Sequence, residues 1–272
     1  MNILVLGAGS FGTAIANELS MNSENNVYLF SRDKDKVREI NKYNTNKSYF
    51  PNKHLSKSLK ATIDKEIIRT SDVIFIAFPS SVIIQNLTSL KPYFSKDVLF
   101  VNLSKGIYNA GVSIVESIRS ELNTENIVSM KGPSFAVEMM EHAETLLTLG
   151  YSTDNQHNLI RNLIKDTSLH IDATIDMRGV EVLSVLKNIY AVFIGIIDAK
   201  YNSSNTRFMI LTRAFSEIRI LLQILGGDED TLFLSCGFGD LCLTSLNDLS
   251  RNRTLGLLIG KGFFNTDYKA NT

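Results

Sequence analysis

Cysteine is scarce in this sequence, and its two cysteines form neither a metal-binding nor a disulfide pattern. Cys236 and Cys242 are the only cysteines among 272 residues, and none of the 4 histidines lies near them in sequence. Zinc sites need closely spaced Cys and His ligands, and disulfide-stabilised domains need more cysteines. We therefore expect no metal site, and we expect both thiols to be reduced in a cytoplasmic protein.

An excess of charge of either sign is also absent. The 28 basic residues balance the 28 acidic residues. Proteins that bind nucleic acids or anionic membranes usually carry a basic surface, so we expect neither kind of partner. A local basic pocket for a small anionic molecule remains compatible with this balance.

The chain lacks a membrane-length apolar run and a targeting segment. In its most apolar region the uninterrupted run covers only Ile189–Ile197, whereas a membrane-spanning helix needs about 20 residues. The N-terminus begins directly with a strand-like run, without the basic region or cleavage site of a signal peptide. We expect a cytoplasmic protein that does not insert into membranes.

A glycine-rich turn, GAGSFG, follows the first expected strand, Asn2–Leu6, and precedes a helical pattern. Gly7 permits a tight turn, Gly9 lets the backbone approach a pyrophosphate, and Gly12 allows close packing of helix on strand. The free N–H groups at the start of the helix would bind the phosphates. This context predicts a dinucleotide site; the alternative is a glycine-rich turn in another α/β protein.

Strand and helix patterns alternate along the first part of the chain and then give way to helices alone. Continuous apolar runs such as Val73–Phe78 are typical of parallel strands that helices cover on both faces. No strand candidate follows Asp176. We predict an α/β Rossmann-type domain with a mostly parallel, doubly wound sheet at residues 1–175, and an all-α substrate domain, apparently truncated, at residues 176–272.

The end of the second expected strand, Val27–Phe30, bears on the choice of nicotinamide cofactor. An acidic residue there would accept hydrogen bonds from the adenosine ribose. This chain has Ser31 and Arg32 instead, which suit the 2′-phosphate of NADP better, while the nearby Asp33 keeps NAD possible. We expect NADP or NAD, with NADP slightly favoured; the alternative for Arg32 is a solvated surface arginine.

A long apolar helix is expected at Met177–Asp198, buried on nearly every side, with a lysine in its middle. Lys187 lies on a narrow face of mostly small residues, at spacings of three and four: Val180, Ser184, Lys187, Ala191, Gly195 and Asp198. Such a face admits a neighbouring backbone or a ligand. Burial would lower the lysine pKa and make it a proton donor or acceptor near neutral pH. Alternatively, Lys187 pairs with a structural carboxylate or extends to the surface.

Three further places attract attention as ligand sites. Lys105 follows a strand end, where open α/β sheets bind ligands, although it could be an ordinary surface lysine. Asp240 lies in a glycine-framed loop and could pair with Lys187. Ser250 can cap a helix that begins with Arg251 and Asn252, which favours an anion such as a phosphate; a plain N-cap is the alternative.

Taken together and in order, these segments resemble the NAD(P)-dependent glycerol-3-phosphate dehydrogenases of bacteria over nearly the whole chain. The matching pieces are GAGSFGTAIA (7–16), IFIAFPSS (74–81), SKGI (104–107), GPSFAVE (132–138), GVE (179–181), LKNIYA (186–191), NTR (205–207), GFGDLCLT (237–244) and SRNRTLG (250–256). Each is modest evidence alone, but the ordered set is highly specific.

The resemblance implies reversible hydride transfer between a nicotinamide and C2 of dihydroxyacetone phosphate, which supplies sn-glycerol 3-phosphate for phospholipid synthesis. It implies a catalytic role for Lys187, with Lys105 and Asp240 beside it. The implied substrate contacts are Lys105, Gly132, Ser134, Lys187, Asp240, Ser250, Arg251 and Asn252. The implied cofactor contacts, added to those of the glycine turn, are Ser10, Phe11, Arg32, Lys105, Ala136 and Arg251. A homodimer is also possible.

The sequence departs from the family pattern in two respects. Ala199, Tyr201 and Ser203 stand where glycines are expected in a turn that would line the substrate site, and the chain ends at Thr272, before segments that the family usually has. One alternative is therefore a catalytically impaired, shortened relative that keeps nucleotide binding. Another is a dehydrogenase of the 3-hydroxyacid or 6-phosphogluconate type, which also places a lysine and an asparagine on a central helix.

Overall fold

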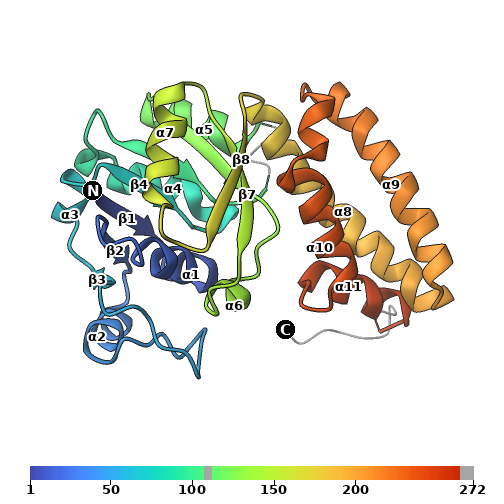
Figure 1. The fold of residues 1–272 in the computed structure, drawn as a ribbon, viewed down its shortest axis with the longest axis horizontal. Coiled ribbons are helices and arrows are strands. Elements are labelled where there is room, and N and C mark those ends of the chain that lie inside the picture. The colour runs from blue at the N-terminus through green and yellow to red at the C-terminus, as the bar shows by residue number, and fades with distance from the viewer. Residues whose placement is uncertain (107–111, 264–272) are drawn as a thin grey trace.

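In the computed structural model, which describes residues 1–106 and 112–263, eight strands form one sheet (Figure 1). The order across the sheet is β3-β2-β1-β4-β5-β6-β7-β8, and neighbours run parallel except for the antiparallel pair β6 and β7. The expected mostly parallel, doubly wound sheet is thus confirmed. The strands are β1 (Asn2–Leu6), β2 (Asn26–Phe30), β3 (Lys60–Thr62), β4 (Val73–Ile76), β5 (Leu99–Asn102), β6 (Ile127–Lys131), β7 (Thr145–Gly150) and β8 (Leu169–Thr174).

Helices cover both faces of this sheet, and the strand residues alternate between the two faces. Ile3 and Val5 belong to the core that includes Ile15 of the first helix, whereas Leu4 and Leu6 belong to a second core on the opposite face. Both faces are therefore dry, which explains the continuous apolar runs. The helices are α1 (Ser10–Leu19), α2 (Lys34–Tyr43), α3 (Glu66–Arg69), α4 (Ile83–Leu90), α5 (Ile114–Leu122), α6 (Ala136–Met139) and α7 (Asp154–Leu163).

Strand β3 has no counterpart among the strands expected from the sequence. It is a short edge strand beside β2, and only Ala61 of its three residues is buried. An edge strand with one buried side chain leaves no apolar run, so its hydrophobic pattern cannot reveal it. Ile107 and residues 264–272, which include the expected early end of the chain, lie outside the described residues.

The regular structure that follows β8 in the described part of the chain is helical. Figure 1 shows these helices grouped beside the end of the sheet that holds β7 and β8. The longest is the expected lysine helix, and it contacts each of the other three. The helices are α8 (Met177–Tyr201), α9 (Ser204–Ile224), α10 (Asp240–Leu246) and α11 (Arg251–Gly260).

The small-residue face of α8 is buried along its length, and in its second half it accommodates a helix backbone rather than a ligand. A Cβ atom added at Gly195 would lie 2.4 Å from the carbonyl oxygen of Arg253 on α11. One added at Gly256 of α11 would lie 2.0 Å from the carbonyl oxygen of Val192. Two glycines facing each other therefore set the close approach of α8 and α11.

The expectation that α8 is buried on nearly every side is wrong. Ile189 and Phe193 are 59% and 46% exposed, so the second half of the helix has an outward apolar face. The helix is long and apolar enough to span a membrane, but 56% of its most apolar window is buried within the protein, as in the core helix of a globular domain.

The turn expected after Asp198 is also different in the structure. Helix α8 continues to Tyr201 and ends where Asn202 adopts a left-handed conformation, with φ of 40°. Ala199 and Tyr201 are therefore helical, and Ser203 caps α9 by accepting a hydrogen bond from the backbone of Thr206. These residues therefore form the junction between α8 and α9. Asn202 can end α8 because asparagine tolerates the left-handed conformation that glycine would otherwise provide.

Candidate active site

The glycine-rich turn connects β1 to α1 and leaves open space at one position only. Gly7 has φ of +114°, and a Cβ atom there would lie 2.9 Å from the carbonyl oxygen of Ala77; at Gly12 it would lie 2.0 Å from the carbonyl oxygen of Gly7. Both positions need glycine for backbone packing. At Gly9 a Cβ atom would meet nothing within 4 Å, so this surface is free to take another molecule.

Helix α1 begins at Ser10 and Phe11, directly after this open surface. Among the described residues no side chain caps its first turn, so the N–H groups there have no side-chain acceptor. This arrangement fits a pyrophosphate, which glycine lets approach closely and which the helix start attracts.

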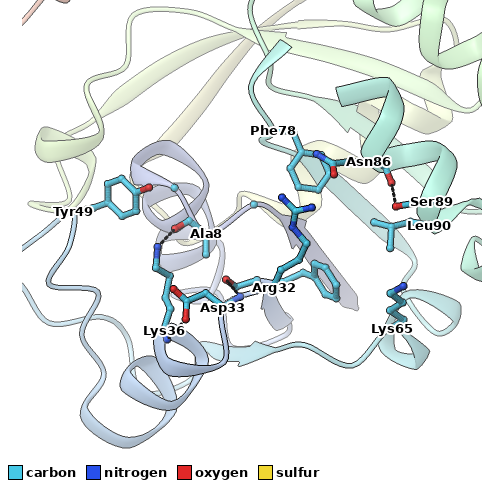
Figure 2. A pocket seen from close by; sticks show the side chains of 14 residues that line it. Ala8, Arg32, Asp33, Lys36, Tyr49, Lys65, Phe78, Asn86, Ser89 and Leu90 are labelled. Carbon is cyan, nitrogen blue, oxygen red and sulfur yellow. Dashed lines mark hydrogen bonds between the residues drawn. The ribbon is translucent and has the colours of Figure 1, made fainter. Parts of the chain in front are cut away.

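A cavity of about 360 Å³ continues from the glycine turn past the end of β2 (Figure 2). Three of its side chains are basic: Arg32, Lys36 and Lys65. Figure 2 shows Arg32 extending across the cavity toward Phe78 and Asn86. The cavity therefore combines a phosphate cradle with an electropositive wall, and its size and chemistry fit the adenosine half of a nicotinamide cofactor.

Asp33 is the acidic residue among the described residues that line this cavity, and one of its carboxylate oxygens is engaged elsewhere. Its Oδ1 accepts hydrogen bonds from the backbone N–H groups of Asp35 and Lys36, at 2.9 Å and 3.1 Å, and so caps α2. The Lys36 ammonium lies over the ring of Tyr49, 4.7 Å from its centroid, and donates to the carbonyl oxygen of Ala8 at 3.4 Å.

The second cluster joins the two lysines singled out from the sequence through one carboxylate. Oδ1 of Asp240 lies 2.6 Å from Nζ of Lys187, and Oδ2 of Asp240 lies 3.0 Å from Nζ of Lys105. Asp240 and Lys187 are buried, whereas 28% of the Lys105 side chain is exposed. The cluster is therefore open to solvent on the Lys105 side.

Burial dominates the electrostatics of Lys187. Loss of hydration lowers its pKa from 10.5 to about 7, and the neighbouring charge of Lys105 acts in the same direction. The carboxylate of Asp240 opposes both effects. A lysine that titrates near pH 7 can donate or accept a proton under physiological conditions.

Several other residues predicted from the sequence surround this cluster. Lys105 also donates to the carbonyl oxygen of Gly132 at 3.4 Å, and the hydroxyl of Ser134 donates to the same oxygen at 3.1 Å. Ala136 begins α6 a little further along the same loop. The ends of β5 and β6 thus meet α8 and α10 at one place.

The start of α11 reaches this place through a pair of amides. Nδ2 of Asn252 donates to Oδ1 of Asn188 at 2.7 Å, and Asn188 directly follows Lys187 on α8. Ser250 caps α11 by accepting from the backbone of Arg253, while Arg251 is exposed in the first turn. Ser250 therefore acts as the N-cap, and the exposed guanidinium of Arg251 remains accessible to an anion at the same helix start.

Two polar residues at the site escaped the sequence analysis. Thr244 accepts a hydrogen bond from Nζ of Lys187 at 2.8 Å and contacts Oδ1 of Asp240 at 3.2 Å. Its position one turn after Asp240 on α10 is the pattern that could have revealed it. Asn188 entered the sequence analysis only within the matching piece LKNIYA, and its partner on α11 lies too far along the chain to be inferred from local spacing.

The two cysteines form no hydrogen bond or ion pair with Lys105, Lys187 or Asp240 within the described residues. Both are free, and Cys236 is fully buried, which raises the pKa of its thiol to about 12. Within residues 1–106 and 112–263, no group of three or more His, Cys, Asp or Glu side chains is placed to hold a metal ion.

Comparison with known protein families covers both parts of the chain. The N-terminal model of NAD-dependent glycerol-3-phosphate dehydrogenase matches residues 2–157, and the C-terminal model of the same family matches residues 176–271.

Individual relatives and a solved structure agree with this match. The chain is 38% identical to the glycerol-3-phosphate dehydrogenase [NAD(P)+] of Methanothermobacter thermautotrophicus, over 96% of its own length and 81% of that protein. It is 35% identical to the enzyme of the same name from Bacillus subtilis, over 96% and 77% of the two chains. The crystal structure of glycerol-3-phosphate dehydrogenase from Coxiella burnetii superposes with a TM-score of 0.88 at 30% identity, covering 96% of this chain and 80% of that one.

Proposed function

The chain belongs to the NAD-dependent glycerol-3-phosphate dehydrogenase family, and we propose that Lys187, Lys105 and Asp240 carry its reaction. It is an oxidoreductase that uses NAD or NADP to interconvert dihydroxyacetone phosphate and sn-glycerol 3-phosphate. The observation that supports the three residue roles is the shared carboxylate of Asp240, which lies 2.6 Å from Nζ of Lys187 and 3.0 Å from Nζ of Lys105.

In the direction of reduction, Lys187 donates a proton to the carbonyl oxygen of the substrate. The nicotinamide, when bound, supplies the hydride that adds to C2. Proton and hydride together convert the C=O group to a secondary alcohol, and Lys187 is left as a neutral amine. In the reverse direction the neutral amine takes the hydroxyl proton.

Lys105 and Asp240 prepare this proton transfer. The ammonium of Lys105 is the more exposed of the two lysines, so it can approach the substrate oxygen and stabilise the negative charge that develops there. Asp240 orients both ammonium groups, and Thr244 gives Nζ of Lys187 a second fixed partner at 2.8 Å. Holding the donor in one geometry is a large part of what such a site contributes.

The phosphate of the substrate belongs at the start of α11. Ser250, Arg251 and Asn252 present a capped helix N-terminus, one guanidinium and one amide there. Gly132 and Ser134 complete the contacts on the side of Lys105. The amide pair between Asn252 and Asn188 supports a phosphate site near Lys187, because Asn188 directly follows that lysine on α8.

The cofactor cavity favours NADP over NAD. Its basic side chains Arg32 and Lys36 suit the 2′-phosphate, together with the hydroxyl of Ser31. Asp33, the residue that could instead serve the ribose hydroxyls of NAD, already caps α2 through Oδ1. The pyrophosphate would contact the open surface at Gly9 and the helix start at Ser10 and Phe11, while Gly7 and Gly12 shape the turn; Lys105, Ala136 and Arg251 would contact the nicotinamide half.

We propose that the protein acts on its small phosphorylated substrate in the cytoplasm. The sn-glycerol 3-phosphate formed there would enter phospholipid synthesis. Residues 1–175 would bind the nucleotide, and residues 176–272 would bind the substrate. The outward apolar face of α8, with Ile189 and Phe193, is compatible with a homodimer. Light scattering of the purified chain would give its mass in solution.

Purified protein with dihydroxyacetone phosphate tests the function directly. We expect the protein to oxidise NADPH, and NADH more slowly. The reaction is monitored by the loss of absorbance at the reduced nicotinamide band. Nucleotide binding without turnover would support a catalytically impaired relative instead. Faster turnover of a phosphorylated or unphosphorylated hydroxy acid would point to a dehydrogenase of the 3-hydroxyacid or 6-phosphogluconate type.

A further inference from the structure

A buried ion pair lies between the sheet and α8 and joins Lys131 to Glu181. Nζ of Lys131, the last residue of β6, is 3.0 Å from Oε1 of Glu181 on α8, and the two side chains are 0% and 3% exposed. The hydroxyl of Ser129 and Nδ2 of Asn102 also donate to Oε1 of Glu181. The other carboxylate oxygen, Oε2, is buried without a hydrogen-bond partner in the described residues.

This pair is continuous with the loop that carries Lys105. Lys131 donates to the carbonyl oxygen of Asn102 at 2.9 Å, at the end of β5. The side chain of Asn102 accepts from the backbone N–H of Ser104 at 3.0 Å, and the hydroxyl of Ser104 donates to the carbonyl oxygen of Phe78 at 2.6 Å. The backbone immediately before Lys105 is thus tied to the buried pair and to the loop that follows β4.

The same pair also adjoins the other partners of Lys105. Gly132, whose carbonyl oxygen accepts from Nζ of Lys105, is the next residue after Lys131. Glu181 lies on α8, which carries Lys187 further along the helix. One buried contact therefore joins the loop that bears the first lysine to the helix that bears the second.

We propose that the pair of Lys131 and Glu181 positions Lys105 against Asp240, so that both lysines act on one substrate oxygen. Neither residue touches the substrate; each acts through the loop ends of β5 and β6. The proposal rests on the functions assigned above to Lys105 and Lys187.

Stability alone is a poor explanation for this pair. Burying two charges costs much of what their attraction returns, and apolar replacements of similar size are often neutral for folding. Here burial lowers the pKa of Lys131, and within the described part of the chain Oε2 of Glu181 has no hydrogen-bond partner. A pair that is so poorly compensated is better explained by the register it imposes on the loop of Lys105.

The double variant Lys131→Met/Glu181→Gln separates the two explanations. It removes both charges but keeps an oxygen that can accept from Asn102 and Ser129, so we expect a melting temperature near that of the unaltered protein. With its tether lost, Lys105 moves away from Lys187. Because Lys105 lowers the pKa of Lys187, that pKa should rise from about 7.

The pKa of Lys187 is measured by NMR, as a pH titration of its Cε resonance in protein labelled with ¹³C-lysine. This resonance is assigned as the one that disappears in Lys187→Arg. An upward move of the midpoint in the double variant supports the positioning role, and an unchanged midpoint overturns it. If the double variant does not fold, Lys131→Met alone serves, because it also removes the ion pair; the same upward move is expected.

Asp198→Asn provides the matched control. Asp198 forms another buried ion-pair cluster on α8, with Arg207 and Arg253, and within the described residues this cluster makes no contact with Lys105. This variant should lower the melting temperature and leave the midpoint of Lys187 where it is. A midpoint that moves equally in this control would show a general loosening of the fold and would overturn the proposal.

Turnover supplies a second, separate readout. In the double variant we expect kcat/KM for dihydroxyacetone phosphate to fall roughly 10- to 100-fold, as for a misplacement of about 1 Å. The titration needs no turnover, so the two ideas fail separately. An unaltered chain without turnover would contradict the proposed function, whereas the midpoint decides the positioning role.

Discussion

Asp240 and Lys187 form a buried ion pair, 2.6 Å between Oδ1 and Nζ, in which the lysine titrates near neutral pH. The two residues come from α10 and α8, which pack together in the helical part of the chain. The carboxylate raises the pKa of the lysine, but burial and the charge of Lys105 lower it by more. The balance leaves Lys187 able to exist in either protonation state under physiological conditions.

The pH dependence of the two reaction directions should therefore be opposite. Reduction needs the protonated lysine, so its rate falls as pH rises through about 7; oxidation needs the neutral amine, so its rate rises over the same range. Initial rates measured in both directions at saturating cofactor check this. Ionisation of the substrate phosphate would shift both directions in the same sense, so parallel profiles would contradict the assignment to Lys187.

Cofactor choice should depend on the basic wall of the cavity. We expect Arg32→Ala and Lys36→Ala each to weaken NADPH binding by about 10- to 100-fold, because each removes a charge-assisted contact to the 2′-phosphate. NADH binding should change little. Calorimetric titration with both cofactors measures this, and Lys34→Ala, an exposed lysine near the start of the same helix, is the control. Equal losses for NADPH and NADH would argue against a 2′-phosphate site.

Two glycines with different surroundings should respond differently to alanine. Gly256→Ala forces α11 away from α8 and should cost about 1–3 kcal/mol of unfolding free energy, since its Cβ would lie 2.0 Å from the carbonyl oxygen of Val192. Gly9→Ala meets nothing within 4 Å, so it should leave stability unchanged but weaken NADPH binding. Urea denaturation and cofactor titration of both variants separate the effects. Loss of stability in Gly9→Ala would contradict an open phosphate surface.

Part of the fold and site could be predicted because the relevant patterns are local. The turn at Gly7 lies between its own strand and helix, and the stripe through Lys187 repeats along a single helix. Thr244 was within reach by the same reasoning, since it follows Asp240 by one helical turn.

Other features depend on contacts between distant segments and leave no local pattern. Lys131 and Glu181 meet only because β6 ends against α8, and Glu181 entered the sequence analysis only as part of the matching piece GVE. The exposure of Ile189 and Phe193 depends on which helices cover α8, which composition does not determine. Edge strand β3 was missed because it buries a single alanine.

The most direct test of the central claim is the rate of dihydroxyacetone phosphate reduction by Lys187→Met, measured beside the unaltered protein at saturating NADPH. Methionine keeps the length of the buried side chain but cannot donate a proton. If Lys187 is the proton donor, kcat falls by about 10²- to 10⁴-fold while the affinity for NADPH is retained. A variant that reduces the substrate at the unaltered rate would contradict this role for Lys187.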